Sequence, residues 1–154
     1  MGGDELDRIS AAIASLMRVA ESDRVHAARL AATGLDLSRT ELRILGVLDG
    51  HEAHTGTVLS SMLHVSQPTA SRTLRRLEAD GYVQRTDDAG DGREVRYQST
   101  TRGRTASRRF EARQKEELAM ALAHLPPGRR RDLAALLEEF VAGTYALPQV
   151  RRRA

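Results

Sequence analysis

The chain has 154 residues, a formal net charge of +3 and no cysteine. This length suffices for one domain with its own apolar core, and the lack of cysteine excludes a disulfide framework, a cysteine-based zinc site and a thiol redox switch. No apolar run approaches the roughly 18 residues of a membrane span, and the acidic N-terminal segment is unlike a signal peptide. We therefore expect a soluble cytoplasmic protein without a membrane partner.

Apolar residues recur at helical spacing in the first part of the chain. This spacing predicts one long amphipathic helix over residues 4–32, which ends at Gly34 because glycine tolerates the left-handed backbone of a helix C-terminus. A second helix is expected to begin at Ser38, since Ser38 and Glu41 have the spacing of a capping box. The apolar face of this helix consists of Leu42, Leu45 and Leu48.

Two shorter helices are expected next, joined by a tight turn over residues 63–66. One covers residues 56–63, and its predicted buried residues are Val58, Leu59, Met62 and Leu63. The other is capped by Ser66 and has Pro68 in its first turn, where the missing N–H costs nothing. The short turn holds the pair at the steep angle of a helix-turn-helix motif.

The residue period then changes from helical to alternating. Residues 82–85 and 94–98 predict two short strands, and the turn-forming composition of residues 87–92 completes a β-hairpin between them. A helix-turn-helix followed at once by a hairpin predicts a winged helix-turn-helix in a mainly α-helical chain.

The terminal helices have wide apolar stripes and no core of their own. A fifth helix is expected from Thr100 or Thr101 to about His124, and a sixth helix after Pro127. Because these helices and the first one have too little of this small domain to pack against, a second copy of the chain is the expected partner.

The helix capped by Ser66 is the candidate recognition helix, which would enter the DNA major groove. Residues 66–76 contain no acidic side chain, so this face can approach a polyanion without like-charge repulsion. A solvated polar face is the alternative interpretation. The residues expected to contact DNA are Ser66, Gln67, Pro68, Thr69, Ser71, Arg72, Arg75 and Arg76. Phosphate contacts are expected from Ser38, Arg39 and Thr55.

Three motifs carry a family resemblance. Residues 77–85, Leu-Glu-Ala-Asp-Gly-Tyr-Val-Gln-Arg, are similar to a signature Leu-Glu-x-x-Gly-aromatic/aliphatic-Val-x-Arg; residues 88–93 are similar to Asp-x-x-Asp-x-Arg, and residues 100–103 to Thr-x-x-Gly. Together with the helix order, they make the chain resemble the MarR family (multiple antibiotic resistance regulator) over nearly its whole length. Ser99 departs from the family, which usually has leucine there, and this could loosen the join between wing and fifth helix.

The resemblance implies a role for the hairpin, or wing. Arg93 would be the wing-tip arginine that enters the minor groove, with Asp91 orienting it. For Asp91 the alternative is simple turn chemistry. The basic region of residues 96–115 follows the wing. Its near end is a candidate for flanking phosphates, and its far end is either a solvated face or a wall of an effector pocket.

The resemblance also implies the division of the chain. Residues 1–36 and 101–148 would form a helical dimerisation region, residues 37–100 the DNA-binding lobe, and residues 149–154 a disordered basic tail. The implied function is a repressor that binds an inverted-repeat operator as a homodimer and is relieved by a small aromatic or anionic effector. Candidate effector-pocket residues are Met17, Arg18, His26 and Arg43.

An enzyme and a protein-binding module are the two alternative classes of function. His51 and His54 look like part of a zinc-protease motif, but that motif needs histidines four residues apart on a helix, and here the spacing is three. We therefore expect no enzyme, no metal and no cofactor. A winged helix that binds protein and not DNA is the remaining alternative, and the acid-free face of residues 66–76 argues against it.

Overall fold

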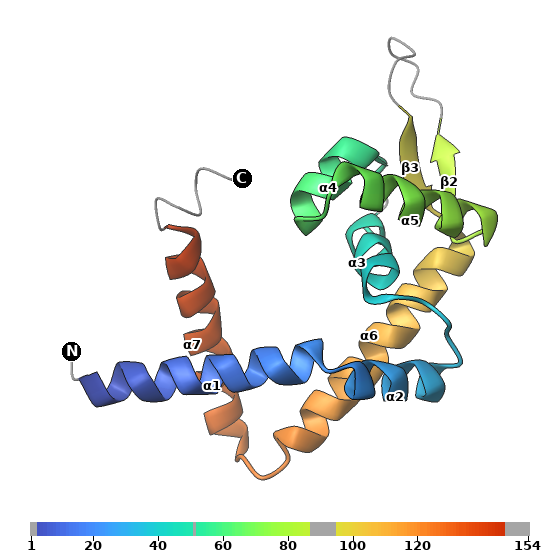
Figure 1. Cartoon of the computed structure of the whole chain (residues 1–154). Coiled ribbons are helices and arrows are strands. Elements are labelled where there is room, and N and C mark those ends of the chain that lie inside the picture. Colours follow the sequence, from blue (N-terminus) through green and yellow to red (C-terminus); the bar gives the residue numbers. More distant parts are fainter. Residues whose placement is uncertain (1–2, 51, 87–94, 147–154) are drawn as a thin grey trace. The chain divides into compact units, whose positions relative to one another are not determined.

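The computed structural model describes residues 3–50, 52–86 and 95–146, and this part of the chain is mainly α-helical with one small sheet, as predicted (Figure 1). The chain divides into two compact units, residues 1–113 and 114–154. The elements within the described ranges are α1 (Gly3–Glu21), α2 (Asp23–Thr33), α3 (Arg39–Leu48), β1 (His54–Thr55), α4 (Gly56–Leu63), α5 (Gln67–Ala79), β2 (Val83–Thr86), β3 (Arg96–Ser99), α6 (Thr101–Ala121) and α7 (Pro127–Tyr145).

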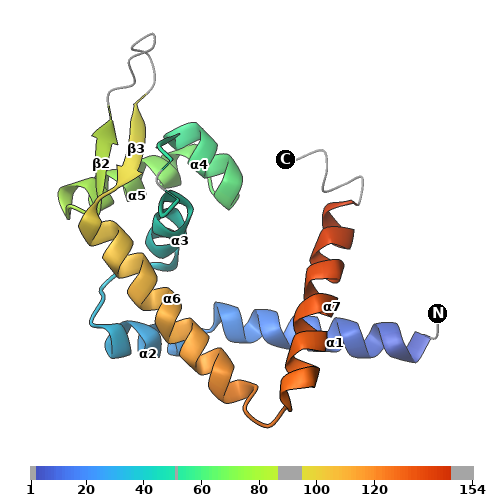
Figure 2. The ribbon, with the colours of Figure 1, turned by 180° about the vertical axis from the view of Figure 1, so that it is seen from behind.

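Helix α3 lies at the centre of the first unit. It has α4 and α5 on one side and the first turns of α6 on the other (Figure 1, and from behind in Figure 2). The predicted capping box is present, because Ser38 Oγ accepts from the Glu41 amide at 3.3 Å and Glu41 Oε2 accepts from the Ser38 amide at 2.6 Å. The core around α3 is formed by Leu37, Leu42, Ile44, Leu45, Leu48, Leu59, Leu63, Leu74, Leu77, Val83, Ala106 and Phe110.

The single long helix predicted over residues 4–32 is wrong, since the chain breaks into α1 and α2 at Ser22. Ser22 has an extended backbone with φ −65° and ψ 119°, and its hydroxyl accepts from the Val25 amide at 3.4 Å. Serine is a favoured N-cap residue, so this break has a local cause. Gly34 does end α2 in the left-handed conformation, as predicted.

The predicted burial of α4 is only half right. Leu59 and Leu63 are buried, but Val58 and Met62 are 42% and 52% exposed. A helix of this length packs a single stripe on α3 and α5, and Val58 and Met62 lie four residues apart on its outer side.

The sheet has one strand more than the predicted hairpin. Strand β1 pairs antiparallel with β3, so the strand order is β1-β3-β2. The hairpin register pairs Val83 with Ser99 and Thr86 with Arg96. A strand of two residues shows no alternation in the sequence, and the pattern of residues 52–55 therefore did not predict it.

Two of the terminal helices bury nothing within the single chain. Neither α1 nor α7 contains a buried residue. Their large exposed apolar side chains are Leu6, Ile9, Leu16, Met17 and Val19 on α1 and Leu136, Leu137, Phe140, Val141 and Tyr145 on α7. The predicted break between the last two helices is present, since α6 ends at Ala121, before the predicted His124, and α7 starts at Pro127. No helix in the described ranges is both long and apolar enough to cross a membrane.

Candidate nucleic-acid interface

Helices α4 and α5 are joined by the tight turn of residues 64–66. His64 ends α4 in the left-handed conformation with φ 52°, and the Val65 amide donates to the Ser60 carbonyl at 3.0 Å. Ser66 then caps α5, with its hydroxyl accepting from the Thr69 amide at 3.3 Å. Local hydrogen bonds therefore satisfy backbone groups at the end of α4 and at the start of α5, and these local contacts set the geometry of the helix-turn-helix.

The inner face of α5 fixes how the helix lies on the domain. Ala70, Leu74 and Leu77 are each 1% exposed or less. Leu74 and Leu77 belong to the core, and α5 packs against α3, α4 and β2, so the opposite face of α5 is held toward solvent.

The outer face of α5 carries most of the residues predicted to contact DNA. Ser66, Gln67 and Pro68 are exposed at its start, and Arg72 and Arg75 are exposed along it. Thr69 and Ser71 are half-buried. Arg75 Nη2 donates to Ser71 Oγ at 3.1 Å, whereas Arg72 makes no ion pair or hydrogen bond with any residue in the described ranges. Arg72 and Arg75 are thus exposed cations that no acidic side chain of the described residues neutralises.

Arg76 differs from the other arginines of α5. Its Nε lies 3.2 Å from Glu41 Oε1 on α3 and 3.8 Å from Asp80 Oδ2. The Arg76 side chain is 58% exposed, whereas that of Glu41 is only 2% exposed. The guanidinium group is therefore bound on its Nε side to a buried carboxylate.

A concavity of about 200 Å³ lies between the start of α4, α5 and β3. It brings Gln67 and Ser71 of α5 together with Thr55, one of the predicted phosphate contacts. Its lining residues are Thr55, Gly56, Thr57, Gln67, Ser71, Leu74, Val95 and Tyr97.

The residues predicted to contact phosphates have structural roles in the single chain. Ser38 caps α3, and Thr55 is 8% exposed and caps α4 by accepting from the Val58 amide at 3.3 Å. Arg39 Nη1 lies 2.7 Å from Asp23 Oδ1, and its Nη2 donates to the Glu21 carbonyl. This ion pair partly neutralises Arg39, which is thereby held against α2.

The base of the wing is tied to the end of α5. Arg85 on β2 forms an ion pair with Glu78 at 2.9 Å and lies over the ring of Tyr97 on β3, 6.0 Å from its centroid. The wing-tip residues Asp91 and Arg93 lie outside the described residues. The wing base is thus joined to the end of α5 by an ion pair.

None of the four residues predicted to line an effector pocket lines the concavity between α4, α5 and β3 or the one beside the start of α6. Met17 is 56% exposed, and Arg18 Nη2 donates to Ser15 Oγ within α1. A ring nitrogen of His26 lies 3.2 Å from the Leu37 carbonyl oxygen. Arg43 Nη2 donates to the Leu63 carbonyl at 2.8 Å.

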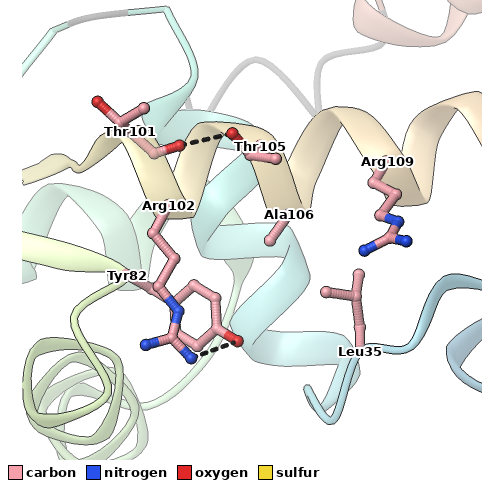
Figure 3. A pocket seen from close by; sticks show the side chains of 7 residues that line it. All are labelled: Leu35, Tyr82, Thr101, Arg102, Thr105, Ala106 and Arg109. Atoms are coloured by element: carbon pink, nitrogen blue, oxygen red, sulfur yellow. Dashed lines mark hydrogen bonds between the residues drawn. The ribbon is translucent and has the colours of Figure 1, made fainter.

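A second concavity, of about 280 Å³, lies beside the start of α6 (Figure 3). The guanidinium carbon of Arg102 lies 4.5 Å from the centroid of the Tyr82 ring at one end, and Arg109 extends above Leu35 at the other. Ala106 lies between them (Figure 3). Its lining residues are Leu35, Tyr82, Thr101, Arg102, Thr105, Ala106 and Arg109.

Two cationic side chains line this concavity, and neither of them was among the residues predicted to line an effector pocket. Neither Arg102 nor Arg109 has a carboxylate partner in the described part of the chain. The sequence indicated this concavity only through the arginine-rich region 96–115. Within that region, Arg104 and Arg108 cannot be distinguished from Arg102 and Arg109 by sequence. The structure distinguishes the two pairs of arginines. Arg104 donates to the Ser99 carbonyl and Arg108 pairs with Asp49 at 3.4 Å, whereas the other two line the concavity.

Comparison with known proteins relates this geometry to one family. Residues 35–94 match the model of the MarR family. Among curated proteins, none matches the chain.

Solved structures match most of the chain at low identity. The crystal structure of RV1404 from Mycobacterium tuberculosis has a TM-score of 0.73 and 22% identity and covers 94% of this chain and 95% of its own. FabT of Streptococcus pneumoniae, solved in complex with DNA, has a TM-score of 0.70 at 20% identity, with coverage of 90% and 96%. MepR, a transcription regulator of a Staphylococcus aureus multidrug efflux pump, has a TM-score of 0.65 at 21% identity, with coverage of 94% and 99%. At these identities the likeness concerns the fold.

Proposed function

We propose that this chain, which belongs to the MarR family through its residues 35–94, is a sequence-specific regulator that binds double-stranded DNA. The proposed function is regulatory and not catalytic, as is that of the family. The observation that carries the proposal is the outer face of α5, where Arg72 and Arg75 are exposed near the strands of the wing and are not neutralised by any acidic side chain in the part of the chain that the structure describes. The DNA-bound structure of FabT, which has the same fold, supports this use of the motif.

The protein is proposed to act as a homodimer. Leu16 on α1 is 65% exposed and Leu136 on α7 is 63% exposed in the single chain. A second copy would cover the large apolar side chains that α1 and α7 each expose in the single chain. Two copies related by a twofold axis would place their α5 helices about one DNA turn apart, roughly 10 base pairs, on an inverted repeat.

The wing and the helix starts would complete the contact. Arg93 is proposed to enter the minor groove, oriented by Asp91, and Ser38, Arg39 and Thr55 to lie near phosphates. The protein would act in the cytoplasm, where its DNA target lies. Occupancy of an operator by the dimer would exclude the transcription machinery, so a repressor is the proposed role.

A small anionic effector is proposed to bind the concavity of Arg102 and Arg109. The guanidinium groups at its two ends suit one or two carboxylates, and Leu35, Ala106 and the Tyr82 ring suit an apolar body between them. Its volume of about 280 Å³ fits a small organic acid. The set Met17, Arg18, His26 and Arg43 remains a separate prediction for the same role.

Selection of bound fragments from genomic DNA, followed by titration at several salt concentrations, tests the proposed function. We expect an inverted repeat whose affinity falls with salt at a log–log slope steeper than about −3, because each neutralised phosphate contributes roughly −0.9. A flat salt response, or equal affinity for all duplexes, would favour a winged helix that binds protein.

A further inference from the structure

Glu41 is a carboxylate buried in the core of the DNA-binding lobe. Its side chain is 2% exposed, yet both oxygens have partners. Oε2 accepts from the Ser38 amide at 2.6 Å, and Oε1 lies 3.2 Å from Arg76 Nε. A buried carboxylate is costly unless it is paired, so its position depends on both partners.

The two partners of Glu41 belong to different helices. Ser38 is the N-cap of α3, the central helix, and Arg76 lies in the last turn of α5. The capping box alone would need only the bond to Ser38. The ion pair with Arg76 is additional to the capping box, and it connects α3, the central helix, to the helix proposed to read DNA.

From this connection we infer that Arg76 is a positioning residue and not a DNA contact. The inference rests on the proposed function. In sequence, Arg72 and Arg76 are equivalent arginines on one helix face. In the structure, Arg76 is bound to Glu41 and Arg72 has no partner among the described residues.

The place of the ion pair makes it effective. Arg76 lies nine residues after Gln67, which is roughly 14 Å along a helix that rises 1.5 Å per residue. A shift of about 2 Å at the Arg76 end would tilt the helix by roughly 10° about its first turn, which reaches the angular tolerance of a specific site. The pair thus restrains the end of α5 that lies farthest from its first turn.

Salt dependence separates a positioning residue from a phosphate contact. Loss of a phosphate contact in both copies of a dimer lowers the magnitude of the log–log salt slope by roughly 1.8, twice 0.9. Loss of a positioning residue lowers operator affinity but leaves the slope and the affinity for random duplexes unchanged, because the same phosphates are neutralised.

The experiment compares Arg76→Gln, Glu41→Gln and the double variant with the wild type. Affinity for the best selected duplex and for a random duplex is measured by fluorescence anisotropy at several salt concentrations. Arg72→Gln, one turn earlier on the same helix, is the matched control. Folding is checked by circular dichroism, and Glu41→Gln keeps an oxygen that can accept from Ser38.

We expect Arg76→Gln to weaken operator binding about tenfold or more at an unchanged slope. Glu41→Gln should do the same although its carboxylate is too buried to touch DNA, and the double variant should be no worse than either single variant, because neighbours in one ion pair are not additive. A slope change near 1.8 in Arg76→Gln, or unchanged operator affinity, overturns the inference. If Glu41→Gln does not fold, Arg76→Gln decides alone. If the wild type itself shows no salt-dependent binding to DNA, the proposed function is refuted instead.

Discussion

Gly103 at the start of α6 lies directly against the carbonyl oxygen of Tyr82 at the base of the wing. A β-carbon at position 103 would overlap this oxygen and crowd the hydroxyl of Ser99. The same carbonyl accepts from the Thr100 amide at 3.0 Å. The close approach explains why a glycine occupies a helix interior, where it would otherwise cost stability, and it joins the wing base to α6.

Gly103→Ala should therefore destabilise the protein by about 1–3 kcal/mol, the usual cost of overpacking. The matched control is Gly46→Ala on α3, where an added β-carbon meets nothing within 4 Å. It should stabilise by about 0.5–1 kcal/mol, since alanine is the better helix former. Urea unfolding of both variants measures the difference, and a stabilising Gly103→Ala would contradict the close packing.

Ser99, where the family usually has leucine, has a buried hydroxyl with no hydrogen-bond partner in the described residues. Ser99→Ala should be neutral or stabilise by up to about 1 kcal/mol, because it removes an unsatisfied polar group. Thr100→Ala should cost about 1 kcal/mol. Its hydroxyl donates to the Gly81 carbonyl at 2.8 Å and accepts from the Gly103 amide at 3.1 Å. Equal thermal shifts in the two variants would be inconsistent with these contacts.

The helix starts could be predicted from the sequence because their determinants are local. Ser38 with Glu41 and Ser66 with Pro68 each specify a helix N-terminus within a few residues. The break at Ser22 was missed although residues 21–24 are all polar, because a single serine cap was not interpreted as the start of a new helix. The strand β1 was missed because its two residues acquire meaning only when β3 pairs with them.

The site could be predicted at the level of an element but not of each side chain. The acid-free stretch marks α5, and its arginines Arg72 and Arg75 do lie on the exposed side of the helix, opposite the buried Leu74. Arg76 differs from Arg72 because it pairs with Glu41. Glu41 is distant in sequence, and the capping box already accounts for a glutamate at this position, so no sequence pattern indicated the ion pair. In the same way, only packing distinguishes Arg109 from Arg108.

Dimerisation through the terminal helices can be tested with a charge on α7. Leu136→Asp should shift the mass from dimer toward monomer in light scattering at micromolar protein, because burial of a carboxylate at an apolar interface is costly. Val58→Asp is the control, since Val58 is 42% exposed on α4, outside the terminal helices. A wild-type monomer mass, or equal shifts in both variants, would contradict a terminal-helix interface.

The effector concavity can be tested by thermal shift with a panel of small aromatic and aliphatic carboxylates. A compound at 100 times its Kd should stabilise the wild type by about 2.7 kcal/mol. Arg109→Gln should weaken the response about tenfold, whereas Arg108→Gln, which removes an arginine already paired with Asp49, should not. A response that survives Arg109→Gln and Arg102→Gln together would place the ligand elsewhere.

The last prediction concerns how α5 reads sequence. Arg72 is exposed without a partner among the described residues, and Arg75 is exposed with Nη2 bonded to Ser71. If each reaches a guanine in the major groove, Arg72→Ala and Arg75→Ala should each relax specificity at one position of every half-site. The expected loss of discrimination there is about 1–3 kcal/mol.

Arg39→Ala is the control for a general loss of positive charge, because Arg39 is already paired with Asp23 at 2.7 Å. It should weaken binding to all duplexes by the same small factor and leave the base preferences unchanged. Affinities for a set of duplexes with every single-base substitution in one half-site measure both effects. If Arg72→Ala and Arg75→Ala weakened binding uniformly, as Arg39→Ala does, these arginines would contact phosphates, and base reading would have to come from Gln67 and Ser71 at the start of the helix.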